Sequence, residues 1–263
     1  PHAAPRGPSV NHPEHREGKR PGCDSYRFAL EMLRCTIPGS YAARNAGIQQ
    51  ASGDVFAFID ADCIPDARWL AEGVAALEQG GGANFVGGEV RILPPIPRTA
   101  IGLYQYIAGF QQQLNVEHRH FSATANLFCF AKQMVEIGPF APDLLSGGDR
   151  EWSWRAIRCG LGLIYKESAI VHTPPRTSIR GAIRQARRVA GGRKHLQERG
   201  LTHLNPSLLK PHRTGLAAVR WILTHPELTW WERLNVLGAA VAIRCTTAVE
   251  GVRLRAGGHG ERR

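Results

Sequence analysis

The sequence predicts an α/β fold in which a mostly parallel sheet is flanked by helices. Short apolar runs such as residues 55–60 (VFAFID) are rich in β-branched and aromatic residues and carry no charge until their ends, as buried parallel strands do. Helical patterns alternate with these runs: an Ala-rich segment, residues 40–53, precedes the first, and an amphipathic segment, residues 66–79, follows it. Such alternation is typical of a doubly wound sheet.

Local signals set the limits of the first elements. Ser40 follows a Pro-Gly turn and is a suitable N-cap, Pro65 opens the second helix, and the glycines at 80–82 end it. The remaining elements are expected in this order: a strand at 85–93, a helix at 100–114, a strand-like run at 120–132, a Gly-rich turn and helix at 144–160, two short strand pieces at 162–172, a basic helix within 176–199, and apolar helical stretches at 216–223 and 234–249.

Composition limits the class of protein. The 263 residues are 43% hydrophobic and 21% charged, which is ordinary for a globular protein. The formal net charge of +11 indicates an anionic partner, such as a phosphorylated substrate, an anionic lipid or a nucleic acid. The six cysteines form no CxxC pair and residues 1–22 contain no apolar signal segment, so we expect a cytoplasmic location.

We expect three parts in the chain. Residues 1–25 are rich in Pro and charge and are predicted to be a disordered or non-native leader. Residues 26–175 carry the alternating pattern of the α/β domain. Residues 176–263 are predicted to be a basic and amphipathic helical extension.

Two carboxylates stand at the end of the run FAFIDADCIP. Asp60 and Asp62 are one residue apart, where the predicted strand meets a turn, and ligands of doubly wound sheets bind at the carboxyl ends of strands. Hard oxygen donors in this arrangement suit Mg²⁺ or Mn²⁺, which commonly take substrate phosphates as further ligands. The alternative is that the two side chains only cap the turn before the next helix.

Two ordered blocks of the sequence resemble a known family. SYAARNAGIQQASGDVFAFIDADCIPDARWL (residues 40–70) is similar to the central segment of family-2 glycosyltransferases of the GT-A fold, with its ARN-x-G helix, D-x-D motif and following W-L. FAPDLLSGGDREWSWRAIRCGLGLIYKESAIVHTPPR (residues 140–176) resembles the same family's second block. The resemblance covers roughly residues 37–195. It implies a Rossmann-like GT-A domain that moves a sugar from a nucleotide-sugar donor to an acceptor hydroxyl with inversion.

The resemblance also assigns catalytic and metal-binding roles. Asp60 and Asp62 match the D-x-D that holds a divalent cation and, through it, the donor diphosphate. Asp149 matches the acid that serves as general base in inverting transfer, because the attacking hydroxyl must lose its proton. His172 matches a histidine that adds a ligand to the same metal, and a core or surface position is the alternative for it.

Further residues are implied in binding the substrates. Arg44 and Asn45, together with Asp60, fall on the donor side, although packing and capping are the simpler explanation for Arg44 and Asn45. Four residues are candidates for contacting the acceptor: Thr124, Asn126, Glu151 and Trp152. A buried turn for the first two and a core position for the tryptophan are the alternatives.

The sequence departs from the family pattern in two places. Gly148 stands where the family has a glutamate, and Glu151 is a partial substitute. No segment before Gly39 resembles the family's first apolar strand and its acidic, nucleotide-reading turn. We therefore expect that the chain is a fragment, that its start is not the natural one, or that the nucleotide pocket is incomplete, and the activity of this chain stays open.

The basic segment 176–199 has eight Lys or Arg residues against one Glu. A solvated charged face is its simplest explanation, and attraction to an anionic membrane surface is the functional one, which would place the protein peripherally at the inner face of the plasma membrane. No nucleic-acid module accompanies it, so we expect no nucleic acid partner.

The sequence thus predicts a metal-dependent glycosyltransferase with a glycan or lipid-linked acceptor, in cell-envelope or exopolysaccharide synthesis. The alternatives are a nucleotidyltransferase of similar fold, which would need a Gly-rich phosphate loop that is not seen, and a truncated, non-catalytic basic binding module.

Overall fold

The computed structural model describes residues 30–144, 146–200 and 215–258. Residues Cys35–Arg263 form one compact unit, which therefore includes most of the expected α/β domain and the expected helical extension. Residues 30–34 carry no helix or strand. The expected leader, residues 1–25, lies outside the described residues.

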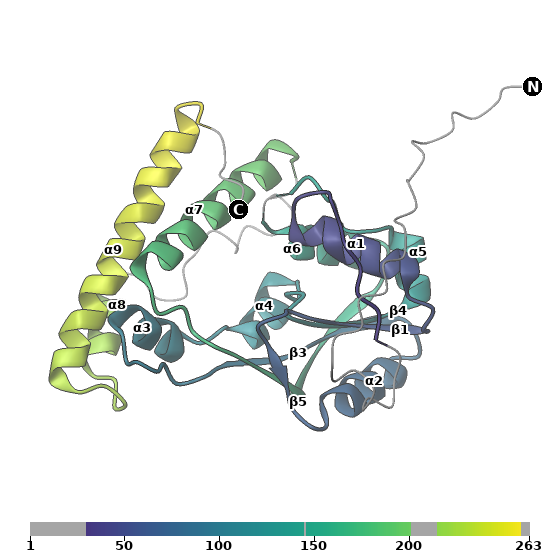
Figure 1. The fold of residues 1–263 in the computed structure, drawn as a ribbon, viewed down its shortest axis with the longest axis horizontal. Coiled ribbons are helices and arrows are strands. Elements are labelled where there is room, and N and C mark those ends of the chain that lie inside the picture. The colour runs from purple at the N-terminus through teal and green to yellow at the C-terminus, as the bar shows by residue number, and fades with distance from the viewer. Residues whose placement is uncertain (1–29, 145, 201–214, 259–263) are drawn as a thin grey trace, which may run out of the picture. The chain divides into compact units, whose positions relative to one another are not determined.

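A five-stranded sheet forms the centre of the compact unit (Figure 1). Its strands are β1 (Val55–Ile59), β2 (Ile64–Pro65), β3 (Asn84–Ile92), β4 (Asn126–Phe130) and β5 (Gly162–Thr173), and they lie in the order β1-β4-β3-β5-β2. The long pair β3–β5 is parallel, whereas β1–β4, β3–β4 and β2–β5 are antiparallel. The prediction of an α/β fold is confirmed.

The expectation of a mostly parallel sheet needs a correction. β1, β3 and β5 point the same way, but β4 runs against its two neighbours and separates β1 from β3. Side-chain periodicity determines which face of a strand is buried and says nothing of its neighbour or direction, so the sequence could not show this insertion. In addition, 162–173 is one strand with a register shift opposite Gly88 and Glu89, not two short pieces.

Helices cover both faces of the sheet. On one face lie α1 (Ser40–Gln50), α4 (Gln112–Arg119), α5 (Ala131–Ile137) and α6 (Gly148–Arg158), and on the other lies α2 (Trp69–Gln79) (Figure 1). Strand β1 shows the alternation that produces the two layers: Phe56 and Phe58 pack in the α1 and α6 core, while Val55, Ala57 and Ile59 pack in the α2 core.

The predicted helix at 100–114 is two helices. α3 (Ala100–Ala108) ends at Gly109, whose φ of 65° is left-handed, and Gln111 with a φ of 63° precedes α4. A left-handed residue cannot continue a right-handed helix, so the chain changes direction there. The predicted helix ran on through Gly109 to Leu114 because apolar residues continue that far.

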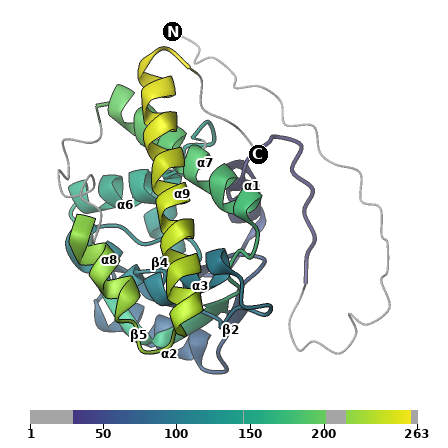
Figure 2. The same ribbon diagram turned by 90° about the vertical axis from the view of Figure 1, so that its left-hand side faces the viewer.

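The C-terminal helices pack on one another and on α3 (Figure 2). They are α7 (Ile179–Glu198), α8 (Gly215–Leu223) and α9 (Trp230–Arg255), and α9 begins at a capping box in which Thr229 and Glu232 bond each other's backbone N–H groups. Leu103 of α3 is buried with Ile222 and Val236 of α8 and α9. Of the described helices, none is long and apolar enough to span a bilayer.

Candidate active site

A cleft of about 1190 Å³ lies beyond the carboxyl end of β1. The turn after β1 contributes Asp60 and Asp62, and the first turn of α6 contributes Asp149. α1 supplies Arg44 from another side, and α7 forms a further wall. The structure thus brings both acids of the D-x-D and the expected base to one cavity.

The turn that carries the D-x-D is tight. The backbone N–H of Cys63 donates to the carbonyl oxygen of Asp60 at 2.9 Å, which closes the turn without using either carboxylate. Burial raises the pKa of the Cys63 thiol, and the carboxylates of Asp60 and Asp62 raise it further. Both acids therefore lie near this one thiol, which stays protonated.

Arg44 is the partner of Asp60. Its Nη2 donates to Oδ1 of Asp60 at 2.5 Å, and the two side chains are 18% and 40% exposed. The Arg44 guanidinium lies 5.6 Å from the centre of the Tyr41 ring. Asp62 makes no ion pair with another described residue and is exposed. One acid of the motif is thus neutralised by the protein, and the other faces solvent.

Asp149 is held by its own helix and by Tyr41. Its Oδ1 accepts from the backbone N–H of Arg150 at 2.9 Å and from the Tyr41 hydroxyl at 3.4 Å. Burial, and secondly the Asp149 carboxylate, raise the pKa of Tyr41, so the phenol stays neutral and remains a donor. The carboxylate is therefore oriented by two N–H or O–H groups while it lines the cleft.

Tyr41 also explains the departure at Gly148. A Cβ added to Gly148 would lie 2.8 Å from the Tyr41 ring, closer than side chains pack. The ring of Tyr41 is buried, with 6% of its surface exposed. A glutamate at position 148 and the tyrosine at position 41 in its present place are incompatible.

His172 is not grouped with the D-x-D. It lies in β5, where its backbone is in register with Ile64 of β2, while the next residue, Thr173, lines the cleft. Adjacent residues of a strand point to opposite faces. Within the described residues, no three His, Cys, Asp or Glu side chains come together as a metal-binding group.

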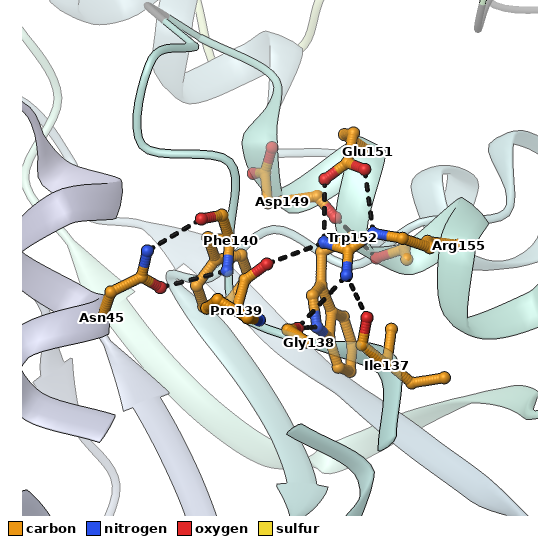
Figure 3. Close-up of polar contacts among 10 residues, drawn as sticks. Asn45, Ile137, Gly138, Pro139, Phe140, Asp149, Glu151, Trp152 and Arg155 are labelled. Carbon is orange, nitrogen blue, oxygen red and sulfur yellow. Dashed lines mark hydrogen bonds and ion pairs between the residues drawn. The ribbon is translucent and has the colours of Figure 1, made fainter. Parts of the chain in front are cut away.

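Asn45 and Asn126 are bound to backbone groups. Asn45 Nδ2 donates to the carbonyl of Phe140 at 2.7 Å, and its Oδ1 accepts from the Phe140 N–H at 3.0 Å (Figure 3). The Asn126 side chain is fully buried and accepts from Trp69 Nε1 at 2.8 Å. Neither side chain lines the cleft. The structure favours the packing alternative for Asn45, and for Asn126 it favours a buried position at the start of β4 over contact with a substrate.

Glu151 and Trp152 face the protein interior and not the cleft. Arg155 donates to Glu151 at 2.9 Å and to the carbonyls of the loop at 137–139, and Trp152 Nε1 donates to the carbonyl of Gly138 at 3.0 Å (Figure 3). Trp152 has no exposed surface, so the expected contact with an acceptor is not possible in this arrangement. Trp152 is therefore a core residue, although its neighbours in the sequence are polar.

Thr124 lies in the wall of the cleft, with 4% of its surface exposed. Of the four residues expected to contact an acceptor, it is the one that lines the cavity. Arginines that were not predicted as site residues also line it, among them Arg119 of α4, Arg150 of α6 and Arg193 of α7. Their separation along the chain left no pattern by which the sequence could have joined them.

The comparisons with known proteins identify the segment around the D-x-D. Residues 23–131 match the model of glycosyl transferase family 2. This segment is similar to family-2 glycosyltransferases. The match begins ahead of Gly39, where no resemblance had been recognised, and it ends before Asp149, so the role of that residue rests on the second block and on its position in the cleft.

Two curated relatives carry glycosyltransferase names. The chain is 39% identical over 138 residues to glycosyltransferase AglE of Haloferax volcanii, an alignment that covers 52% of this chain and 45% of the relative. It is 27% identical over 194 residues to the pre-mycofactocin glycosyltransferase of Mycobacterium tuberculosis, covering 70% of this chain and 40% of that one. The chain thus spans less than half the length of either relative.

Among solved structures, the chain is similar to the mannosyltransferase PcManGT from Pyrobaculum calidifontis in complex with GDP-Man and Mn²⁺. The identity is 16% and the TM-score 0.44, over 83% of this chain and 58% of that one.

Proposed function

We propose that this family-2 segment and the helices behind it form a metal-dependent glycosyltransferase that moves a sugar from a nucleotide-sugar donor to an acceptor hydroxyl with inversion. The observation that carries the proposal is the convergence of Asp60, Asp62 and Asp149 on one cleft of about 1190 Å³. The family match and the two glycosyltransferase relatives support it.

Asp60 and Asp62 fit a divalent cation by their chemistry. Both offer carboxylate oxygens, the ligands that Mg²⁺ and Mn²⁺ prefer, and they lie on one short turn beside the cleft. Because the described residues contain no trio of metal-binding side chains, the remaining ligands would come from the donor diphosphate and water. When bound, the cation would offset the negative charge that develops on the departing diphosphate.

Arg44 contributes to the same step from the protein side. Its bond to Oδ1 of Asp60 fixes the orientation of this carboxylate. The guanidinium also places a positive charge at the edge of the cleft, where the donor diphosphate would lie. Arg44 would therefore support donor binding partly by orienting the Asp60 carboxylate.

Asp149 would accept the proton of the acceptor hydroxyl as the hydroxyl oxygen attacks the anomeric carbon. The Tyr41 hydroxyl and the Arg150 N–H bind one carboxylate oxygen, Oδ1, which leaves Oδ2 for the substrate. An attack from the side opposite the departing diphosphate inverts the configuration at the anomeric carbon, and it requires one carboxylate base and no nucleophile of the protein.

Membrane attachment forms part of the proposal through the C-terminal helices. Trp230 and Trp231 at the start of α9 are 59% and 74% exposed, and Leu216 of α8 is 87% exposed. Exposed aromatic and aliphatic side chains near a cationic helix favour a lipid–water interface. A lipid-linked or cell-envelope glycan acceptor would be reached at the inner face of the plasma membrane. Sedimentation with anionic and with neutral vesicles at low salt tests this attachment. If all of the protein stayed in the supernatant with both kinds of vesicle, the attachment would be excluded.

The transfer itself is tested with a panel of UDP- and GDP-linked sugars and Mn²⁺. We expect one donor to bind and to be hydrolysed slowly in the absence of acceptor, with EDTA and Asp62→Ala each removing both binding and hydrolysis. Proton NMR of the released sugar then reports the anomer, and inversion is expected. If no donor binds with metal, or if Asp62→Ala binds donor like the wild type, the proposal is wrong.

A further inference from the structure

Three arginines from three helices line the cleft. Arg119 ends α4, Arg150 lies in the first turn of α6 and Arg193 lies in the second half of α7. All three line the cavity that Asp60, Asp62 and Asp149 share. We call them the arginine cluster.

The protein does not neutralise this cluster. None of the three guanidinium groups has a carboxylate within 4.0 Å among the described residues, unlike Arg44 and Arg155, which pair with Asp60 and Glu151. Asp143, a further carboxylate of the cavity, is already bound to Arg199. Grouping cations without an anion is unfavourable, so a structural purpose alone does not explain the cluster.

Two of the three arginines are nevertheless held in place. The Arg150 guanidinium lies 4.3 Å from the centre of the Phe121 ring, and its buried Nε has no hydrogen-bond partner among the described groups. Arg119 Nη1 donates to Asn115 Oδ1 at 2.8 Å. Arg193 is an exposed side chain in the cavity wall and has no ion pair within the described part of the chain. Stacking on Phe121 therefore orients Arg150, and one hydrogen bond orients Arg119. Both guanidinium groups keep N–H donors with no hydrogen-bond partner among the described residues.

The three side chains lie within electrostatic reach of one another. Burial lowers the pKa of the Arg119 and Arg150 guanidinium groups, and the positive charge of Arg193 lowers the pKa of both further. The Asp149 carboxylate acts in the opposite direction on the pKa of Arg150, the residue that follows it in α6. An oxyanion with several acceptor oxygens would relieve the repulsion and use the free N–H groups.

We propose that the arginine cluster binds an anionic group of the acceptor, a phosphate or a carboxylate close to the attacking hydroxyl. The inference rests on the proposed function, because it takes Asp149 as the base that the attacking hydroxyl must reach. The D-x-D holds the donor diphosphate at the end of β1, whereas Arg150 directly follows Asp149 in the chain. The acceptor is therefore an anionic molecule, such as a phosphorylated lipid carrier or a uronic acid.

The test measures anion binding with the full chain. Titration calorimetry at low salt uses inorganic phosphate and glucuronate as separate probes, so that the stronger one distinguishes a phosphate from a carboxylate acceptor. Arg193→Gln and Arg119→Gln each remove one cation, and Arg184→Gln, an exposed residue of α7 outside the cavity, is the matched control. We expect each cluster variant to weaken binding about tenfold, equivalent to ~1.4 kcal/mol, and the control to bind like the wild type.

A second titration separates acceptor from donor. The same probe is added to protein saturated with a nucleotide sugar and Mn²⁺, and its affinity should change by less than about twofold if the two subsites are distinct. Competition between probe and donor would assign the cluster to the donor diphosphate and overturn the inference. The inference would also be wrong if Arg184→Gln lost as much binding as the cluster variants, or if neither probe bound. Probe binding that depends on the cluster, in a chain that binds no donor, would support the anion site and contradict the proposed function instead.

Discussion

Asn126 gives the sharpest contrast between a substrate contact and a structural one. Its Nδ2 donates to the carbonyls of Glu89 in β3 and Ala169 in β5, both at 2.8 Å, and its Oδ1 accepts from Trp69 Nε1 at 2.8 Å. These carbonyls lie where the pairing of β3 and β5 shifts register beside Gly88. The amide of Asn126 thus supplies hydrogen bonds at a place where the parallel ladder is interrupted.

Asn126→Ala removes the side-chain bonds to two carbonyls and one indole N–H in the core. Each buried unsatisfied group costs about 1–3 kcal/mol, and we expect a loss of about 4 kcal/mol in the free energy of unfolding, with relaxation recovering the rest. For a chain of this size this corresponds to a fall in Tm of about 8–16 °C. Thermal unfolding followed by circular dichroism measures the fall.

The matched control is Thr124→Ala, two residues earlier and in the wall of the cleft. No hydrogen bond of its side chain within the described residues is lost, so we expect a change of about 1 kcal/mol or less in the free energy of unfolding. If Asn126→Ala instead kept the wild-type Tm and lost acceptor turnover, the structural role argued for Asn126 would be wrong and its predicted role in acceptor binding restored.

Four further substitutions test the site and the packing around it. Arg44→Gln removes the cation bound to Asp60, so Mn²⁺ alone should bind about fivefold more tightly by calorimetry, and weaker binding would contradict the pairing. Asn45→Ala removes two bonds to one backbone segment and should lower the free energy of unfolding by about 2 kcal/mol, with donor affinity unchanged. Gly192→Ala places a Cβ 2.5 Å from a carbonyl oxygen of the neighbouring loop and should lower it by about 1–3 kcal/mol. Gly238→Ala, with no atom within 4 Å, should stabilise α9 by about 1 kcal/mol, and equal effects of the two glycine changes would contradict the close packing at Gly192.

The parts of the site that the sequence predicted are local ones. The strand VFAFI, its turn and the two carboxylates are adjacent in the chain, so periodicity and turn chemistry were enough to place Asp60 and Asp62 at a strand end. Asp149 is similar, because a Gly-rich turn and a helix start fix its position. The positions of Asp60, Asp62 and Asp149 could therefore be predicted without knowledge of the tertiary packing.

The residues that sequence reasoning misplaced are those whose roles depend on distant partners. Trp152 lies among polar residues in the chain, yet in space it packs on Phe85 and Phe140. Asn126 bonds residues from two other strands. The same limit applies to the direction of β4 and to the arginine cluster, because neither follows from residues close together in the sequence.

The most direct test of the account is a comparison of donor binding and sugar transfer in Asp149→Asn. The amide keeps the size of the side chain and can still accept from Tyr41, but it takes up no proton. We predict that Asp149→Asn binds the nucleotide sugar and Mn²⁺ within about twofold of the wild type, while transfer falls by at least about 10²-fold. Transfer at the wild-type rate would contradict the assignment of Asp149 as the base, and with it the mechanism proposed for this cleft.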